Sequence, residues 1–320
     1  MEFVLSDEES RPFDALDMWV GDIAPNDTKA FLTVLNKYLP IRELAHLKRL
    51  RKTNDDVGTL SILLAPINTT DLGTAEAVVA KLTEWNAAVA PLVSNVRVVG
   101  VSRWPALTRD QFAAFSPAWP MYWRESAARK NPMTSAADQL EYGELMQGLI
   151  ADVVVASSSH RPCGAGLAYN PNTRTVLARS VDTRHVPGRP LIQHAAMNVI
   201  TAVAALPRTK RPTATDHLIH GGLDDASVSR KRRSQDSQHL CSNLMVVLTH
   251  EPCIMCAMAL LHSRVAGVVY AVPSPATGGL GSWAKVHTER KLNHKFMAWR
   301  GCCEDEVREQ VGEMGIDWHY

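Results

Sequence analysis

The sequence predicts an α/β protein with two domains, and three observations support this prediction. The chain has 320 residues, of which 46% are hydrophobic and 21% charged. This is enough to bury a sizeable core and suggests two domains of ~100–200 residues each. Strand-like and helix-like patterns alternate in two separate stretches. Between them lies a stretch rich in proline and tryptophan, over residues 104–135. We therefore expect a small α+β domain, a linking strap, and a larger domain with helices on the faces of a central sheet.

The first domain is expected over residues 15–103, after a polar tail formed by residues 1–14. Its apolar residues alternate between the period of a half-buried strand and that of an amphipathic helix. The expected elements are, in order, a strand at 17–24, a helix at 26–39, a strand at 59–66, a helix at 74–90 and a strand at 95–103. This alternation is typical of a two-layer, ferredoxin-like α+β domain.

The second domain is expected over residues 136–320, and it begins with a long helix at 139–158. Next we expect two short strands, at 164–170 and 175–181, and a helix that follows His194. After these come a strand at 243–250, a helix from Cys253 and a last strand at 265–272. A polar insertion with basic character, residues 207–242, interrupts this pattern and is expected to be a loop.

Composition excludes several classes of protein. The net charge is +1, so any nucleic-acid-binding surface must be local. The acidic N-terminus "MEFVLSDEES" is unlike a secretory signal, and no apolar run approaches the ~18 residues of a membrane span. The six cysteines in a chain of this length suit a reducing compartment and metal binding better than a disulfide framework. An intracellular protein without a membrane partner is expected.

The sequence Pro252-Cys253-Ile254-Met255-Cys256 follows an apolar strand and opens a helix. Cysteines three residues apart share one helical face, and the helix N-terminus favours the thiolates that a metal needs. Alone, this spacing also suits a redox pair or core packing. His194 alone is also explained as a core histidine. Together, a histidine that opens one helix and a Pro-Cys-x-x-Cys that opens the next are the signature of the zinc deaminases, H-x-E…P-C-x-x-C.

The expected metal ligands are therefore His194, Cys253 and Cys256, with Zn²⁺ as the cofactor. In such a site the metal lowers the pKa of a bound water so that it attacks the carbon bearing the amine, and a glutamate moves the protons. Here Ala196 occupies the glutamate position. Loss of a positioned general acid–base costs about 10²–10⁴-fold in rate, so the site is expected to bind zinc without catalysis. Glu251, next to the motif, is expected to belong to the scaffold.

At this point the chain resembles a known family. The segments "HAAM" (194–197), "VVLTHEPCIMCAMALLHSRV" (246–265) and "LNHKFMAWRG" (292–301) resemble the non-catalytic subunit of the eukaryotic heterodimeric tRNA wobble adenosine deaminase, in the cytidine deaminase superfamily. The resemblance implies a cytidine-deaminase-like three-layer α/β/α domain and a subunit that helps to convert adenosine to inosine in anticodons. It also implies two partners, a catalytic deaminase subunit and tRNA, and no nucleotide cofactor.

The chain departs from that family in one detail, because its aliphatic replacement of the glutamate is alanine rather than the usual valine. Catalytic relatives also carry an asparagine shortly before the metal histidine, whereas residues 174–192 contain none. The departure in size does not change the consequence of the lost glutamate, and the missing asparagine further implies that this chain is inactive alone. The C-terminal tail, with the carboxylate of Tyr320, is a candidate fourth metal ligand.

Contacts with RNA need clustered cations rather than a basic chain. The segment "HLKRLRK" (46–52) is similar to the family's pattern, and Leu44, Leu47 and Leu50 at a spacing of three predict a helical turn that anchors it. The candidate RNA-binding residues are Arg42, His46, Lys48, Arg49, Arg51 and Lys52, and in the insertion Arg230, Lys231, Arg232 and Arg233. The insertion is equally a candidate for nuclear import or a plain solubilising tract, and we expect the protein in nucleus and cytoplasm.

Two alternatives remain open. An autonomous cytidine or nucleoside deaminase would need a second carboxylate near the metal, and Glu251 is the first candidate for it. A non-enzymatic zinc scaffold would bind RNA without a deaminase partner.

Overall fold

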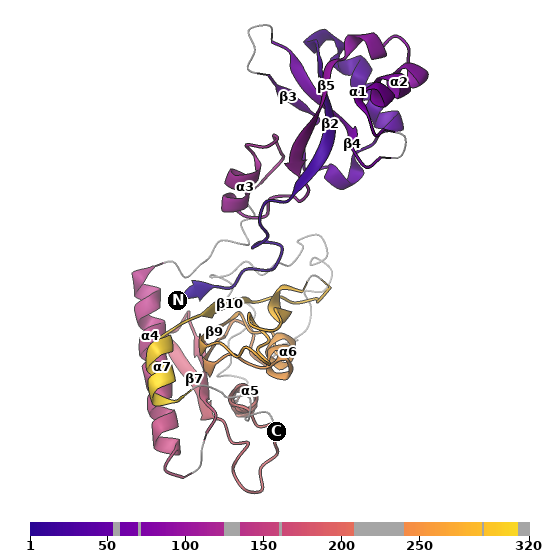
Figure 1. Ribbon diagram of the computed structural model, residues 1–320. Helices are drawn as coiled ribbons and strands as arrows, with labels where there is room; N and C mark the ends of the chain where they lie inside the picture. Colours follow the sequence, from indigo (N-terminus) through magenta and orange to yellow (C-terminus); the bar gives the residue numbers. More distant parts are fainter. Residues whose placement is uncertain are drawn as a thin grey trace. The chain divides into compact units, whose positions relative to one another are not determined.

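A computed structural model of the chain describes residues 1–53, 58–69, 72–124, 135–159, 162–207, 240–289 and 291–312. The chain divides into two compact units, which are described separately: Asp7–Glu125, and Met1–Ser6 together with Ser126–Tyr320 (Figure 1). None of the helices in the described ranges combines the length and the apolar character that a membrane crossing requires.

The unit Asp7–Glu125 is built on a four-stranded sheet in which all neighbouring strands are antiparallel. Its order is β3-β4-β2-β5, with two helices that follow β2 and β4. The elements are β2 (Ala15–Ile23), α1 (Thr28–Tyr38), β3 (Leu50–Lys52), β4 (Leu60–Pro66), α2 (Ala75–Trp85) and β5 (Ser94–Ser102). This order and connection are those of a ferredoxin-like fold, which confirms the expectation for this part of the chain.

The sheet of this unit carries a hydrophobic core on each face. On one face, Phe31 of α1 and Leu82 of α2 pack with Ile62 and Leu64 of β4. On the other face, Leu63 packs with residues that follow β5, including those of α3 (Arg109–Phe115), and the side chains buried there include Phe115 and Trp119. The described part of the expected linking strap, residues 104–124, therefore covers a sheet. The interpretation as a linker is wrong because its large aromatic side chains are the apolar cover that this face needs.

The segment that precedes β4 also differs from expectation. A single 3₁₀ turn spans Arg42–Leu44, and Leu50–Lys52 form the edge strand β3, paired with Leu60–Ile62 of β4. Leu44 and Leu47 are buried on the second face of the sheet, whereas Leu50 packs toward the first. The expected helical turn is wrong because strand pairing sends these leucines to two different cores.

The unit of Met1–Ser6 and Ser126–Tyr320 has a six-stranded mixed sheet of order β1-β10-β9-β8-β6-β7. Strands β8, β9 and β10 are parallel to one another, and the remaining neighbours are antiparallel. The strands are β1 (Glu2–Phe3), β6 (Ala165–Asn170), β7 (Thr175–Val181), β8 (Met245–His250), β9 (Gly267–Val272) and β10 (Met297–Arg300).

Helices cover both faces of this sheet, so the unit has three layers, as expected (Figure 1). On one face lie the helices α4 (Ala136–Ala156) and α7 (Glu304–Gln310). On the other lie α5 (Ala195–Ala205) and α6 (Ile254–His262). Each of the strands β6, β8 and β9 has six residues, and all of them are buried. Because both faces of these strands are covered, their sequences do not alternate between apolar and polar residues.

The first residues of the chain belong to this sheet. Glu2–Phe3 pair with Trp299 and Arg300 of β10 in antiparallel fashion, and the Glu2 carboxylate lies 2.8 Å from the Arg300 guanidinium. The expectation of a polar tail over residues 1–14 is therefore wrong for its beginning. A strand of two residues is too short to produce a periodic signal in the sequence.

Candidate metal centre

Two helix N-termini bring the three expected metal ligands together. His194 is the residue before α5, and Cys253 is the residue before α6; both have extended backbones. Cys256 lies in the first turn of α6 and is 1% exposed. The positive ends of both helix dipoles therefore point toward one place, which stabilises thiolates there. Helices α5 and α6 pack against each other in the same core.

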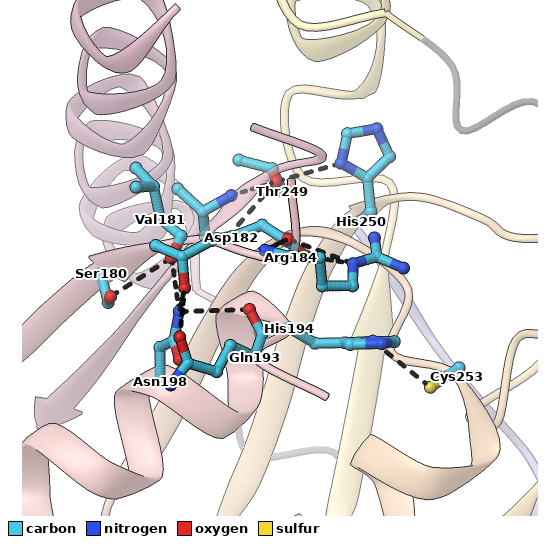
Figure 2. A network of polar contacts seen from close by, with 12 residues as sticks. Ser180, Val181, Asp182, Arg184, Gln193, His194, Asn198, Thr249, His250 and Cys253 are labelled. Atoms are coloured by element: carbon cyan, nitrogen blue, oxygen red, sulfur yellow. Dashed lines mark hydrogen bonds and ion pairs between the residues drawn. The ribbon is translucent and has the colours of Figure 1, made fainter. Parts of the chain in front are cut away.

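The geometry of these three side chains fits a zinc ion. Their candidate ligand atoms all lie within 4.8 Å of one another, and the Cys253 Sγ is 3.6 Å from the His194 Nδ1 (Figure 2). Tetrahedral zinc with ordinary Zn–S and Zn–N bonds separates a sulfur and a nitrogen ligand by about 3.5 Å. One imidazole and two thiols are also the donor set of this metal in catalytic sites. The structure thus brings all three expected ligands close enough to hold one metal ion.

The two thiols differ in their acidity. A hydrogen bond from the Cys256 thiol, followed in importance by one from His194, lowers the pKa of Cys253 to about 4 despite its burial. The same bond to Cys253, together with burial, raises the pKa of the Cys256 thiol above its ordinary range. One sulfur of the pair is therefore ready to bind a cation as a thiolate.

Ala196 lies beside these ligands on the wall of a small cavity, and it is 3% exposed. The volume of the cavity is about 40 Å³, which is room for about three water molecules. A methyl group at this position neither accepts nor donates a proton. Among the described residues, the site holds the metal-binding half of the deaminase signature without its acid–base half.

Glu251 also reaches the cavity wall, but its carboxylate has another role. It accepts hydrogen bonds from the backbone N–H groups of Ser274, Leu280 and Ser282 and from the Ser282 hydroxyl. The residue is 1% exposed, and a Cβ at Gly278 would lie only 2.3 Å from the carboxylate carbon. The carboxylate thus fastens the loop after β9, as a scaffold residue does. A group held by this many donors is poorly placed to take a proton.

His250, the last residue of β8, is fixed in a similar way. Its Nδ1 lies 3.1 Å from the Thr249 hydroxyl, and its Nε2 donates to the Gly312 carbonyl at 2.9 Å. Burial lowers the pKa of this imidazole below its ordinary value. The ring joins β8 to the backbone that follows α7.

The structure adds two residues that the sequence had not indicated. Asp182 and Arg184, directly after β7, line the same cavity and are 3% and 8% exposed. The Arg184 Nε lies 3.1 and 3.0 Å from the two carboxylate oxygens of Asp182 (Figure 2). Two charged residues separated by one position give no spacing or periodicity that marks them as part of a site. Their burial could not be foreseen without the fold.

The expected RNA-binding residues in the other unit divide into two groups. The Arg49 guanidinium is turned inward, where it donates to the backbone carbonyls of Leu39, Leu63 and Leu64. Burial lowers the pKa of Arg49 to about 10. Arg51 donates to the Ala118 carbonyl at 3.2 Å, with its guanidinium carbon 4.4 Å from the centre of the Trp119 ring.

His46 belongs to the same inward group, because its Nε2 donates to the Ser102 carbonyl at 3.0 Å. The other group consists of Arg42, Lys48 and Lys52, which are exposed. The Lys48 ammonium lies 5.7 Å from the ring centre of Tyr122, which is itself 64% exposed. Arg230, Lys231, Arg232, Arg233 and Tyr320 lie outside the described residues.

Comparisons with known families agree with both units. Residues 16–119 match the tRNA-specific adenosine deaminase TAD3 N-terminal domain. Residues 133–272, which include all three expected metal ligands, match the cytidine and deoxycytidylate deaminase zinc-binding region. The chain joins a TAD3 N-terminal domain to a cytidine deaminase domain. The two compact units of the structure correspond to these two domains.

Individual relatives extend over nearly the whole chain. A "tRNA-specific adenosine deaminase subunit tad3" of Schizosaccharomyces pombe is 29% identical, with 94% of this chain and 88% of the relative covered. A "probable inactive tRNA-specific adenosine deaminase-like protein 3" of Danio rerio is 27% identical, over 96% of this chain and 94% of the relative. A solved structure from a study of A-to-I editing by tRNA:A34 deaminases is 20% identical, with a TM-score of 0.37, over 52% of this chain and 97% of that chain.

Proposed function

We propose that this chain is the structural, RNA-positioning subunit of a heterodimeric tRNA adenosine deaminase. The complex converts adenosine to inosine at the wobble position of tRNA anticodons. The partner chain supplies the complete catalytic site, and this chain supplies a matching deaminase domain and a second domain that holds the tRNA. We propose the nucleus and the cytoplasm as its locations.

One observation carries this proposal. A triad of His194, Cys253 and Cys256 with zinc-like geometry lies beside Ala196. Ala196 stands at the position where the deaminase signature has its proton-shuttling glutamate. The name "probable inactive" that several relatives bear is consistent with this loss. When bound, zinc would activate a water in a complete site of this type; in this chain it would hold α5 and α6 together through the three ligands.

An exposed apolar surface on the deaminase domain supports a partner chain. Met255 and Met258 of α6 are 40% and 42% exposed, and Leu191 and Ile192, just before the metal histidine, are 71% and 58% exposed. Large apolar side chains that gather around one site are typical of surfaces that another protein covers. We propose that the catalytic subunit contacts this region.

The outward cations of the TAD3 N-terminal domain are the proposed contacts to tRNA. Lys48 is exposed near Tyr122, and Lys52 is exposed on the edge strand β3. Arg42 is exposed in the preceding 3₁₀ turn. Lysines of this kind bind phosphates, and an exposed aromatic ring stacks on an unpaired base. Arg49 and Arg51 are withdrawn from this set because their guanidinium groups donate to backbone carbonyls.

The two alternatives fare differently. An autonomous deaminase would need Glu251 as its base. This role is disfavoured because the Glu251 carboxylate already accepts hydrogen bonds from four donors. A zinc scaffold without a deaminase partner is separated from our proposal by co-purification, because our proposal requires a second chain with an intact H-x-E motif.

The test is inosine formation in a tRNA with a wobble adenosine, measured for this chain alone, for the partner alone and for the mixture. We expect inosine only with the mixture. Turnover by this chain alone would contradict the proposal, and so would full turnover by the partner alone.

A further inference from the structure

The first residues of the chain are anchored in the deaminase domain. Phe3 pairs with Trp299 of β10, and the centroids of their rings lie 5.5 Å apart (Figure 1). The Val4 backbone N–H donates to the Ala298 carbonyl at 2.9 Å. Phe3 packs against the core on one face of the sheet, and Val4 is buried in the core on the other face. This short strand is therefore held by side chains on both faces as well as by its backbone.

The residues that follow are anchored in the other domain. Gln111 is a buried residue in the first turn of α3. Its side-chain amide donates to the backbone carbonyls of Glu8 and Arg11, at 2.8 and 3.0 Å. The guanidinium carbon of Arg11 lies 4.3 Å from the centre of the Trp104 ring. By these contacts, the segment from Glu8 onward belongs to the TAD3 N-terminal domain.

Only three residues, 5–7, lie between the anchor at Val4 and the anchor at Glu8. The chain thus begins in the deaminase sheet, passes to the N-terminal domain within three residues, and returns to the deaminase domain after Glu125. The N-terminal domain is therefore an insertion with two connections to its host, rather than a domain on a single linker. A connection of three residues reaches no more than about 14 Å between its anchors even when fully extended.

We propose that this short connection, residues 5–7, is a tether that positions the N-terminal domain for tRNA, with Phe3 and Val4 as the positioning residues that hold its deaminase end. The inference rests on the proposed function, in which the N-terminal domain and the partner's catalytic site hold one tRNA. Two binding modules that engage one ligand gain affinity from their effective concentration, and this falls steeply as the connection between them lengthens. The second connection includes residues 125–134, which lie outside the described residues.

The test lengthens the tether without touching either anchor. About twelve glycine and serine residues, which form a flexible chain, are inserted between Leu5 and Ser6. The matched control carries the same insertion between Asn172 and Thr173, in the exposed turn that joins β6 to β7. Each full chain is combined with the partner. KM and kcat are measured for a tRNA with a wobble adenosine, and the Kd for that tRNA is measured at several salt concentrations.

We expect the tether insertion to raise the KM and the Kd for tRNA by about three- to tenfold, because the effective concentration falls. The kcat and the slope of log K against log salt should stay unchanged, since no phosphate contact is removed. The control insertion should change none of these quantities. An unchanged KM, an equal rise in the control, or a salt slope of smaller magnitude would each overturn the proposal.

A second variant releases the anchor and keeps the length of the tether. Phe3→Ser with Val4→Ser removes the apolar contacts of the strand with both cores. If it acts through the same tether, this variant should raise the KM about as much as the insertion, and the combined variant should raise it no further. Additive effects would overturn the proposal, because the strand would then contribute to tRNA binding in another way. Should one variant fail to fold, as judged by circular dichroism, the KM of the other decides.

Failure of the tether and failure of the proposed function are distinguishable. Double electron–electron resonance between one spin label in each domain, measured on this chain alone, gives a distribution of distances that depends on no activity. We expect the distribution to broaden in both variants. Partner-dependent inosine formation with an unchanged distribution and KM would reject the tether alone. A broader distribution without any partner-dependent inosine formation would overturn the proposed function, and with it the role of the tether toward tRNA.

Discussion

The metal triad and the basic segment of the N-terminal domain are both groups of chemically suggestive residues, yet the fold treats them in opposite ways. His194 and Cys253 lie far apart in the sequence and meet at 3.6 Å. Lys48 and Arg49 are neighbours in the sequence, but their side chains point to different surroundings. Lys48 is exposed to solvent, whereas Arg49 donates to three backbone carbonyls. A metal ligand set has few other uses, so its pattern identifies its role. A cation has many uses, and only its surroundings decide among them.

The largest effect is expected at the metal triad. Cys256→Ser removes a buried ligand, so we expect the zinc content to fall from one ion per chain to near zero. The deaminase domain should also lose at least about 4 kcal/mol of stability, which is the linkage energy of a ligand present at about a thousand times its Kd. Plasma mass spectrometry and calorimetric unfolding measure the two quantities. Cys241→Ser, at a buried cysteine outside the triad, is the control and should keep its zinc; zinc retained by Cys256→Ser would contradict the ligand assignment.

The next effect concerns the carboxylate at the cavity wall. Glu251→Gln replaces an oxygen that accepts N–H groups with an amide that donates, so we expect a loss of about 3 kcal/mol in the stability of the deaminase domain. At a temperature where the variant stays folded, the complex with the partner should keep its rate of inosine formation. A stable variant whose complex has lost activity would show that Glu251 takes part in the chemistry.

A smaller effect sharpens the contrast between the two neighbouring cations. Arg49→Met leaves three carbonyls without their charged donor, and we expect the N-terminal domain to lose about 2 kcal/mol. Lys48→Met, at the adjacent exposed position, should change stability by less than about 0.5 kcal/mol. Urea unfolding of the full chain, followed by tryptophan fluorescence, compares the two variants. Equal stabilities would mean that the inward position of Arg49 has no energetic role.

The smallest effect is expected for RNA binding by the exposed lysines. Lys48→Glu with Lys52→Glu should raise the Kd of the complex for tRNA about tenfold. The slope of log K against log salt is negative, and its magnitude should fall by about one unit per lysine. The control is Lys29→Glu, at an exposed lysine in the first turn of α1. Filter binding at several salt concentrations gives both quantities; an unchanged salt slope would remove these lysines from the interface.

The same contrast explains what could be predicted from the sequence. The strands buried in the deaminase domain, such as Met245–His250, can be predicted from their apolar runs. The ligand triad can be predicted from its residue types and their spacing. The edge strands Glu2–Phe3 and Leu50–Lys52 are too short to show a period. The role of Arg49 depends on acceptors at Leu39, Leu63 and Leu64, which approach it only after the sheet has assembled. The burial of the Asp182–Arg184 pair depends on the assembled fold in the same way.

The most direct test of the central claim places the catalytic defect in the other chain. The complex is reconstituted from this chain, unmodified, and a partner whose H-x-E glutamate is replaced by glutamine, and inosine is measured in a tRNA with a wobble adenosine. We predict no inosine above the background of the tRNA alone, because this chain offers Ala196 where the proton shuttle is needed. Inosine at the rate of the unmodified complex would contradict the account, since the reaction would then be taking place in this chain.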